Sequence, residues 1–144
     1  MPLEWKHETP PRWDKGKSRI LDATAPGVFA LGPFQPGELL PGEWWRVEEN
    51  GAVLGYGWMD TIWGDAEILL AVDPDARRRG VGTFILDRLE REAASRGLNY
   101  LYNVVRPTHP ERARVTRWLE QRRFSRSDED RLMRRVAGTV QGTT

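Results

Sequence analysis

Apolar and polar residues alternate along the middle of the chain in a pattern that predicts two strands and a tight turn. The segments Trp44–Glu48 and Val53–Met59 flank Glu49-Asn50-Gly51. An Asn-Gly pair readily adopts the positive φ angles that a short hairpin turn requires. The apolar run Ala66–Val72 comes next, and we interpret it as a third strand buried on both faces.

A helical repeat replaces the strand pattern after residue 82. Residues 83–96 carry apolar side chains on one predicted face, namely Ile85, Leu86, Leu89 and Ala93. Opposite charges four residues apart, as at Glu92 and Arg96, lie on the other side. Gly97 then predicts the end of this helix, because glycine is the usual residue just past a helix C-terminus.

The last third of the chain predicts a strand, a helix and a closing hairpin. Tyr100–Val105 has the composition of a strand. Thr108 and Glu111 have the spacing of a capping box, with Thr108 as the N-cap of the next helix. Phe124–Ser127 and Arg131–Val136 then form the hairpin. The order of elements predicts one α/β domain with a mixed sheet.

The two ends of the chain differ from this core. Residues 1–43 are rich in proline and glycine, which break regular structure, so we expect an irregular segment packed on the domain. A short helix around Asp14–Thr24 is the exception. The core then spans 44–136, and 137–144 is expected to be a flexible tail.

Composition narrows the class of protein. A chain of 144 residues is the size of one domain, and without cysteine and with only two histidines it predicts no disulfide and no metal site. No run of 18 apolar residues and no signal-peptide pattern occur, so we expect a cytoplasmic protein without a membrane partner.

The net charge of +1 hides an uneven distribution. Residues 1–76 sum to −7 and contain six of the seven tryptophans, whereas residues 77–144 carry 16 arginines and sum to +8. A nucleic-acid binder would show a basic balance overall, so we exclude that class. The distribution instead suggests one anionic and one cationic partner.

The segment Asp65–Thr83 carries the clearest chemistry. A buried strand leads through Arg77-Arg78-Arg79-Gly80-Val81-Gly82 directly into a helix. Glycines let backbone N–H groups approach a ligand, and a helix N-terminus attracts an anion. The segment does not match the Walker motif, because it has no Lys-Ser/Thr pair after the second glycine. It does not match the dinucleotide-binding fingerprint either, because that motif needs three glycines and this loop has two. The segment therefore predicts a pyrophosphate site of another kind.

At these residues the sequence resembles the GNAT superfamily of acetyl-CoA-dependent N-acetyltransferases. Arg77 through Gly82 match the family's Gln/Arg-x-x-Gly-x-Gly/Ala loop, and Val72-Asp73-Pro74 is similar to its strand ending. The resemblance covers about residues 44–136. It implies a mixed, mostly antiparallel sheet flanked by helices, and acetyl-CoA as co-substrate without a metal. It leaves a homodimer open.

The resemblance also implies which residues bind the cofactor. The backbone of the strand would bind the pantetheine arm, and the backbone of the loop would bind the pyrophosphate. Asn103 would either contact the cofactor or satisfy backbone groups. The full set implied in this way is Leu70, Ala71, Val72, Arg77, Arg78, Arg79, Gly80, Val81, Gly82, Thr83 and Asn103.

Glu67 is the candidate general base. It lies in an otherwise apolar strand, and members similar to the histone acetyltransferases have a glutamate in the same Ala-Glu-Ile context. An alkylamine with a pKa near 10.4 arrives protonated, and a carboxylate can take its proton. The alternative is a strand-end glutamate that reaches water.

The family's usual general acid is absent. Most members have a tyrosine on the last helix, five residues before a Gly-Phe pair, where this chain has Leu119 and, for the glycine, Arg123. Tyr100, Tyr102 and His109 are the candidate substitutes, with Tyr102 and His109 singled out, and each has a purely structural alternative. A further alternative is that the thiolate leaves unassisted and takes a proton from water.

For the acceptor, aromatic rings beside carboxylates favour a cationic amine. The candidates are Trp45, Trp58, Asp60, Trp63 and Asp65. The alternative is that the tryptophans are part of the core, as most large aromatic residues are. The resemblance thus implies transfer of an acetyl group to a primary amine, on a small molecule or a peptide. The alternative is a non-catalytic coenzyme-A-binding sensor or regulatory module.

Overall fold

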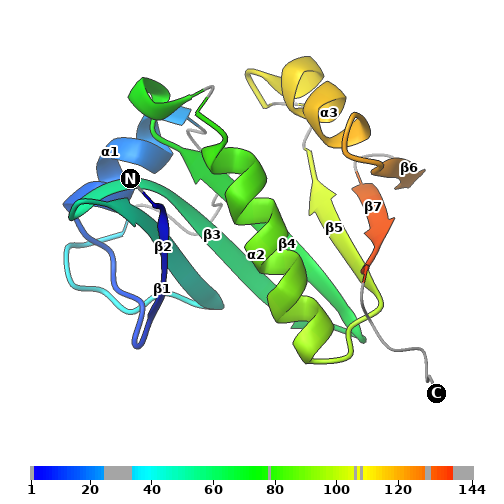
Figure 1. The fold of residues 1–144 in the computed structure, drawn as a ribbon, viewed down its shortest axis with the longest axis horizontal. Coiled ribbons are helices and arrows are strands. Elements are labelled where there is room, and N and C mark those ends of the chain that lie inside the picture. Colours follow the sequence, from blue (N-terminus) through cyan, green and yellow to red (C-terminus); the bar gives the residue numbers. More distant parts are fainter. Residues whose placement is uncertain are drawn as a thin grey trace. The chain divides into compact units, whose positions relative to one another are not determined.

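The computed structural model of the chain describes residues 2–24, 34–77, 79–105, 107, 109–128 and 131–137. Its strands are β1 (Glu4–Glu8), β2 (Glu43–Glu49), β3 (Ala52–Ile62), β4 (Asp65–Val72), β5 (Tyr100–Val104), β6 (Ser125–Asp128) and β7 (Arg131–Arg135). Its helices are α1 (Lys15–Thr24), α2 (Val81–Ser95) and α3 (Arg112–Glu120), with the 3-10 turn η1 (Pro74–Ala76) (Figure 1).

The strands form one seven-stranded sheet in the order β1-β2-β3-β4-β5-β7-β6. The pairs β1/β2, β2/β3, β5/β7 and β6/β7 are antiparallel, and β4/β5 is parallel. A parallel pair needs a crossover connection, and α2 supplies it. The predicted mixed, mostly antiparallel sheet with flanking helices is therefore confirmed.

The central elements lie where the sequence pattern predicts them. Asn50 and Gly51 have φ of 54° and 81° and turn the chain between β2 and β3. Strand β4 and helix α2 match the predicted apolar run and helical repeat to within a few residues. Gly97 has φ of 69° just past α2, as a C-terminal glycine should.

The N-terminal segment is more regular than predicted. The expected helix is present as α1, but residues 4–8 form strand β1, which pairs with β2 from Glu4↔Glu48 to Glu8↔Trp44. The prediction of an irregular segment is wrong for these residues. These five residues precede two prolines, and their sequence alone did not indicate a strand. They form one because they pair with β2.

The start of the last helix is also corrected. Helix α3 begins at Arg112 with Glu111 as its N-cap, and no side chain caps it. The Glu111 N–H donates to His109 Nδ1 at 3.0 Å, and the Glu111 carboxylate binds Arg114. Glu111 therefore lies before the helix and not at the third helical position that a capping box requires. Thr108, the predicted cap, lies outside the described residues.

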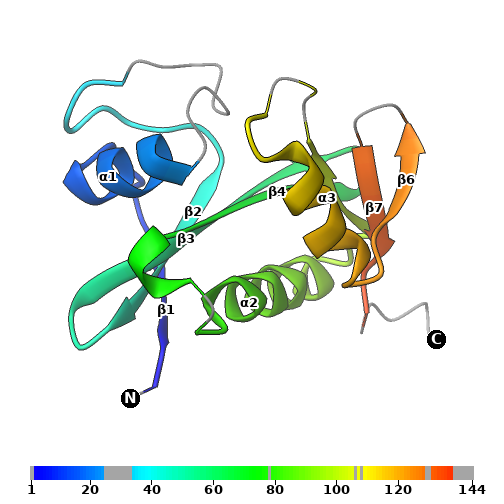
Figure 2. The same ribbon diagram turned by 90° about the horizontal axis from the view of Figure 1, so that it is seen from above.

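The chain forms two compact units. The first comprises Met1–Met59 and Leu69–Arg88. Its apolar cluster contains Ile20, Leu21, Leu40, Trp44, Tyr56 and Ala71. The neighbouring strand residue Gly55 faces the other way, where a Cβ would meet Ile85 and Val81 of α2. Within this unit α1 and the start of α2 thus cover opposite faces of the sheet (Figure 2).

A buried lysine ties α1 to β1 in this unit. Lys17 is fully buried, and its ammonium lies 2.6 Å from Glu8 Oε1 and donates to Arg12 O at 2.8 Å. It also lies 5.0 Å from the centre of the Tyr56 ring, so cation–π attraction adds to the ion pair.

The second unit comprises Asp60–Ile68 and Leu89–Thr144. It holds the paired strands β5, β7 and β6 together with α3 (Figure 1). Its buried apolar residues include Ala66, Ile68, Leu89, Ala93, Leu98, Leu101, Leu119, Phe124 and Leu132. Residues 138–144 of the predicted flexible tail lie outside the described residues.

Candidate functional site

A row of polar side chains crosses the second unit on one face of the sheet. The parallel strands β4 and β5 pair with Ala66 opposite Leu101 and Glu67 opposite Tyr102. Side chains that are opposite in register lie on the same face of a sheet. Glu67 and Tyr102, which the sequence suggested separately, are therefore cross-strand neighbours.

The β3–β4 turn adds two more carboxylates to this face. Trp63 and Gly64 have φ of 52° and 82°, the signs of a two-residue hairpin turn. From such a turn we infer that Asp60 lies opposite Glu67. The same register carried along both strands brings Leu54 opposite Asp73, whose N–H donates to Leu54 O at 2.8 Å.

Asp65 lies two residues before Glu67 on β4, and strand alternation puts it on the same face. Asp60, Asp65 and Glu67 thus share one surface beside Tyr102. Among the described residues, no group of three or more His, Cys, Asp or Glu side chains is placed to hold a metal ion. The carboxylates are therefore arranged along the surface and do not converge on one point.

Burial and the neighbouring charges both act on the pKa of Tyr102. The side chain is only 4% exposed, and burial is the largest cause that raises its pKa. The charge of Glu67 raises the pKa further, as do Asp60 and Asp65, while Arg131 lowers it. The Arg131 guanidinium lies 4.5 Å from the ring centre. The Tyr102 hydroxyl therefore keeps its proton and can donate it to a strong acceptor.

Arg131 was missed in the sequence. It lies on β7, next to the strand pair Tyr102↔Met133 and on the same face as Met133. Only the alternation of the predicted final strand could have indicated this, because nothing local distinguishes Arg131 from the other 15 arginines after residue 76.

The pairing of β4 with β5 is short. It comprises two register positions, and the next carbonyl of β4, Ile68 O, accepts a hydrogen bond of 2.7 Å from Asn103 Nδ2. A side chain therefore takes the place of a ladder bond. Asn103 is 8% exposed, so of the two roles expected for it, the structure shows the one that satisfies the backbone.

The glycine loop is in the first unit. Gly80 has φ of 80°, and nothing lies within 4 Å of the position that a Cβ would occupy. The Phe84 N–H donates to Gly80 O at 3.0 Å, which begins α2, and the first turn of α2 contains no acidic residue. A helix N-terminus of this kind favours an anion.

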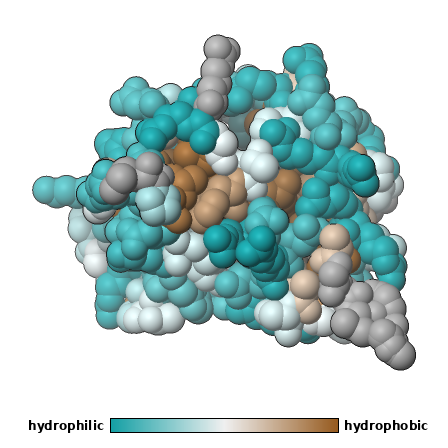
Figure 3. Space-filling model, in the orientation of Figure 1, coloured by the Kyte–Doolittle hydropathy of each residue, from teal (hydrophilic) through white to brown (hydrophobic). Residues whose placement is uncertain are grey.

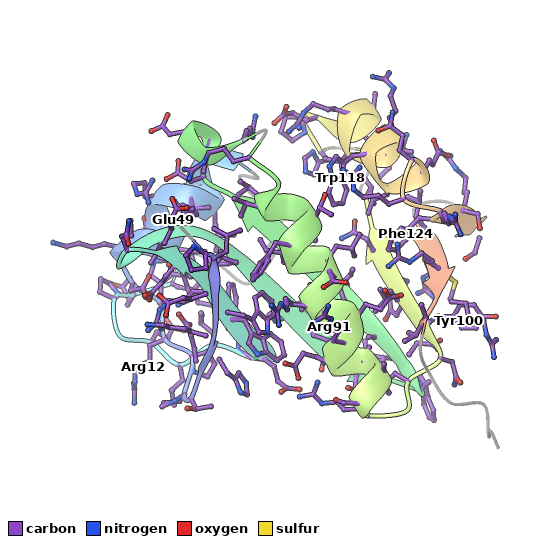
Figure 4. The ribbon with its side chains drawn as sticks, in the orientation of Figure 1. Arg12, Glu49, Arg91, Tyr100, Trp118 and Phe124 are labelled. Carbon is purple, nitrogen blue, oxygen red and sulfur yellow. The ribbon has the colours of Figure 1, made fainter. Side chains whose placement is uncertain are left out.

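The other residues of the loop have different surroundings. Arg79 is half-exposed and donates to Glu49 Oε1 at 2.5 Å, Val81 is buried, and Gly82 and Thr83 belong to the first turn of α2. Figure 4 shows Glu49 at the end of β2. Arg77 follows η1, and Arg78 lies outside the described residues.

The end of β4 is held firmly before the loop begins. Asp73 is buried, accepts the Asp75 N–H at 2.9 Å and forms an ion pair with Arg19 of α1. The hydrogen bond from Arg19 is the largest cause that lowers the pKa of Asp73. On the strand itself Ala71 is buried, whereas Leu70 and Val72 are half-buried.

The predicted acceptor tryptophans have three different environments. Trp45 is 1% exposed, and its ring stacks on Trp5 at 5.5 Å and on His7 at 4.7 Å. Trp58 is half-buried against the first unit's cluster and donates to Pro41 O at 3.1 Å. Trp63, by contrast, is 97% exposed. We therefore leave Trp45 and Trp58 out of the proposed site and keep Trp63.

His109 has a local role. Its ring accepts the Glu111 N–H just before α3, and burial is the main cause that lowers its pKa. The end of the last helix carries the two residues that differ from the family's usual tyrosine and glycine. Leu119 is buried, and Arg123 has φ of 71°, a left-handed conformation that normally favours glycine. Trp118 and Phe124 flank this segment in Figure 4.

The surface agrees with the composition. Most side chains on the face in Figure 3 are hydrophilic, as expected for a chain with 30% charged residues. In the part of the chain that the structure describes, no helix has the length and apolarity to cross a membrane.

Comparisons with known proteins provide the remaining evidence. A model of the acetyltransferase (GNAT) family matches residues 5–132. No curated protein sequence matches the chain significantly. Among solved structures, the ribosomal-protein-S18-alanine N-acetyltransferase from Escherichia coli is 18% identical, with a TM-score of 0.60 over 92% of this chain and 94% of that one.

Two further solved structures have a similar fold. An N-acetyltransferase from Staphylococcus aureus Mu50 is 16% identical, with a TM-score of 0.60 over 94% of this chain and 99% of that one. The N-acetylglutamate synthase from Neisseria gonorrhoeae, complexed with coenzyme A and N-acetyl-glutamate, is 19% identical with a TM-score of 0.67. That match covers 92% of this chain and 35% of the synthase.

Proposed function

The chain belongs to the acetyltransferase (GNAT) family and is an N-acetyltransferase, and from this premise we propose that it transfers an acetyl group from acetyl-CoA to a primary amine. The observation that carries the mechanism is the alignment of Glu67 and Tyr102 across the parallel strand pair. The acceptor attacks directly while both substrates are bound.

The residues present fit coenzyme A. The open space beside Gly80, the start of α2 without acidic residues and the arginines of the loop together suit a pyrophosphate. The backbone of Leu70, Ala71 and Val72 would bind the pantetheine arm as an added strand does. When bound, acetyl-CoA supplies an activated thioester.

Glu67 is the proposed general base. A primary ammonium with a pKa near 10.4 has no lone pair with which to attack. The Glu67 carboxylate takes one of its protons, directly or through a water molecule. Asp60 and Asp65 on the same face attract the cation before this step.

Tyr102 is the proposed general acid. Its raised pKa keeps the hydroxyl protonated, and the hydroxyl lies beside Glu67 on the next strand. It can pass its proton to the sulfur of the leaving thiolate. This assignment also answers the main argument for a non-catalytic sensor, which was the missing tyrosine on the last helix.

Replacing Tyr102 with Phe should lower kcat by about ten- to a hundredfold. This loss is small compared with the usual contribution of a general acid to the rate. A thiol has a pKa near 8.5, so its thiolate leaves readily without a proton donor. Steady-state thiol release measures kcat. Tyr100→Phe is the matched control, because Tyr100 lies two residues away on β5 and contacts Arg135. Equal losses in both variants would remove Tyr102 from the acid role.

Two measurements test the proposed function itself. Calorimetry should show saturable binding of coenzyme A, and thiol release from acetyl-CoA should appear with at least one member of a panel of amino acids, polyamines, aminoglycosides and peptides. Absence of coenzyme A binding would contradict the proposal. Binding without thiol release for any amine would instead support the regulatory alternative.

A further inference from the structure

Trp63 combines two unfavourable properties. Its side chain is 97% exposed, although tryptophan is among the most apolar and bulky residues. Its φ of 52° is left-handed, a conformation in which asparagine or glycine is the usual residue of such a turn. The Asn50-Gly51 turn of the same chain has that usual composition. Folding alone therefore gives no reason for a tryptophan at this position.

The turn that carries Trp63 is held in place. The Asn99 backbone N–H donates to Gly64 O at 2.9 Å, and the Asn99 side chain donates to the same oxygen at 3.4 Å. Both residues belong to the second unit. The exposed indole is therefore presented on a fixed turn, which lowers the entropy lost when a ligand contacts it.

Carboxylates connect this turn to Glu67. Within the residues that the structure describes, neither Asp60 nor Asp65 takes part in an ion pair or a side-chain hydrogen bond. Asp65 lies between the turn and Glu67 on β4, and Asp60 lies on the opposing strand. A cation that binds along this hairpin would meet negative charge and then the face of an indole, which also attracts cations.

The spacing sets the length of the ligand. Asp65 and Glu67 lie two residues apart on β4, which at about 3.3 Å per residue is roughly 7 Å, and Trp63 lies beyond Asp65 in the turn. A single amino acid or a short amine that places its nitrogen at Glu67 is too short to reach Trp63. An extended peptide rises by the same distance per residue, so its third residue would lie level with Asp65 and its later residues would reach Trp63.

We propose that the acceptor is an extended basic peptide, whose terminal amine lies at Glu67 and whose later residues lie along Asp65 and contact Trp63. This proposal rests on the proposed function, because it names the acceptor of the same site. It assigns Trp63 to substrate recognition and not to the chemical step.

Three acceptors and two variants test it. The acceptors are glycinamide, a hexapeptide amide that begins with glycine and continues with basic and aromatic residues, and an acidic hexapeptide amide with the same first residue. Trp63→Asn removes the indole and inserts a residue that suits the turn, and Trp63→Phe keeps an aromatic ring. Spermine serves as a long cation that is not a peptide.

The wild-type protein should use the basic hexapeptide at least tenfold better than glycinamide in kcat/KM, and the acidic one no better than glycinamide. Trp63→Asn should remove the advantage of the basic hexapeptide through KM, should lower kcat/KM much less with glycinamide than with that peptide, and should leave coenzyme A affinity unchanged. Trp63→Phe should retain most of the preference for the basic hexapeptide over glycinamide. Equal losses for glycinamide and the basic peptide, no loss for the peptide, or a Trp63-dependent preference for spermine over the peptide would each overturn the proposal.

A binding measurement separates this proposal from the proposed function. A fluorescent basic hexapeptide with a blocked N-terminus cannot react, so its anisotropy reports binding alone. Trp63-dependent binding without any thiol release would support the peptide site and contradict the enzyme mechanism. Thiol release from small amines, with peptide binding that does not depend on Trp63, would support the mechanism and overturn the peptide site.

Discussion

Glu67→Gln should lower kcat/KM at pH 7 by about 10² to 10⁴, the usual contribution of a general base. Glutamine has nearly the same shape but cannot accept the proton of the ammonium. The loss should shrink as the pH approaches about 10, because the amine then loses its proton to solvent. Initial rates of thiol release between pH 6 and 10 measure this change.

The controls for this variant distinguish catalysis from folding and from cofactor binding. Glu4→Gln makes the same change at an exposed position of β1 and should leave the rate unchanged. Coenzyme A affinity should be unaffected in Glu67→Gln, because the glycine loop is unaltered. A loss that is equal at every pH would indicate a structural role for Glu67, and an unchanged rate would remove it from the mechanism.

The proposed site shows what sequence can predict. The relation between Asp60 and Glu67 depends on a two-residue turn between adjacent strands, so it is set locally and the candidate list contained both residues. The relation between Glu67 and Tyr102 depends on the parallel pairing of β4 with β5, two strands that α2 separates in the chain. Only the resemblance to a known order of elements could indicate that pairing.

The same distinction explains what the sequence pattern alone does not show. Arg131 reaches Tyr102 through the pairing of β5 with β7, which no local pattern encodes. The two acceptor tryptophans that turned out to be packed, Trp45 and Trp58, have the same composition signal as the exposed Trp63. Burial is a property of the folded chain, so a tryptophan in a predicted strand cannot be assigned to a core or to a site by its identity alone.

The N-terminal segment illustrates the limit most clearly. A Pro- and Gly-rich composition correctly indicates few regular elements, yet it conceals β1 and the partner of Lys17. A lysine in a short helix predicts exposure, because lysine is almost never fully buried unless paired. Its partner, Glu8, is in a strand that forms only through its pairing with β2.

Lys17→Met should therefore destabilise the fold by about 3–5 kcal/mol, the usual result of removing one partner of a buried ion pair. Methionine fills a similar volume, but the Glu8 carboxylate, which is 7% exposed, would remain buried without its ammonium partner. Arg46 Nη1, at 3.3 Å from Glu8 Oε2, offsets part of that cost. For a chain of this size we expect the melting temperature to fall by roughly 10–15 °C.

Lys15→Met is the matched control, because it makes the same change in the first turn of α1 at an exposed position. It should alter the free energy of unfolding by no more than about 0.5 kcal/mol. Urea unfolding followed by tryptophan fluorescence measures both variants. The double variant Glu8→Leu/Lys17→Met should be less destabilised than the sum of its single changes, because it removes both buried charges together. Additive losses, or a Lys17→Met protein as stable as the control, would show that this ion pair does not anchor β1 to α1.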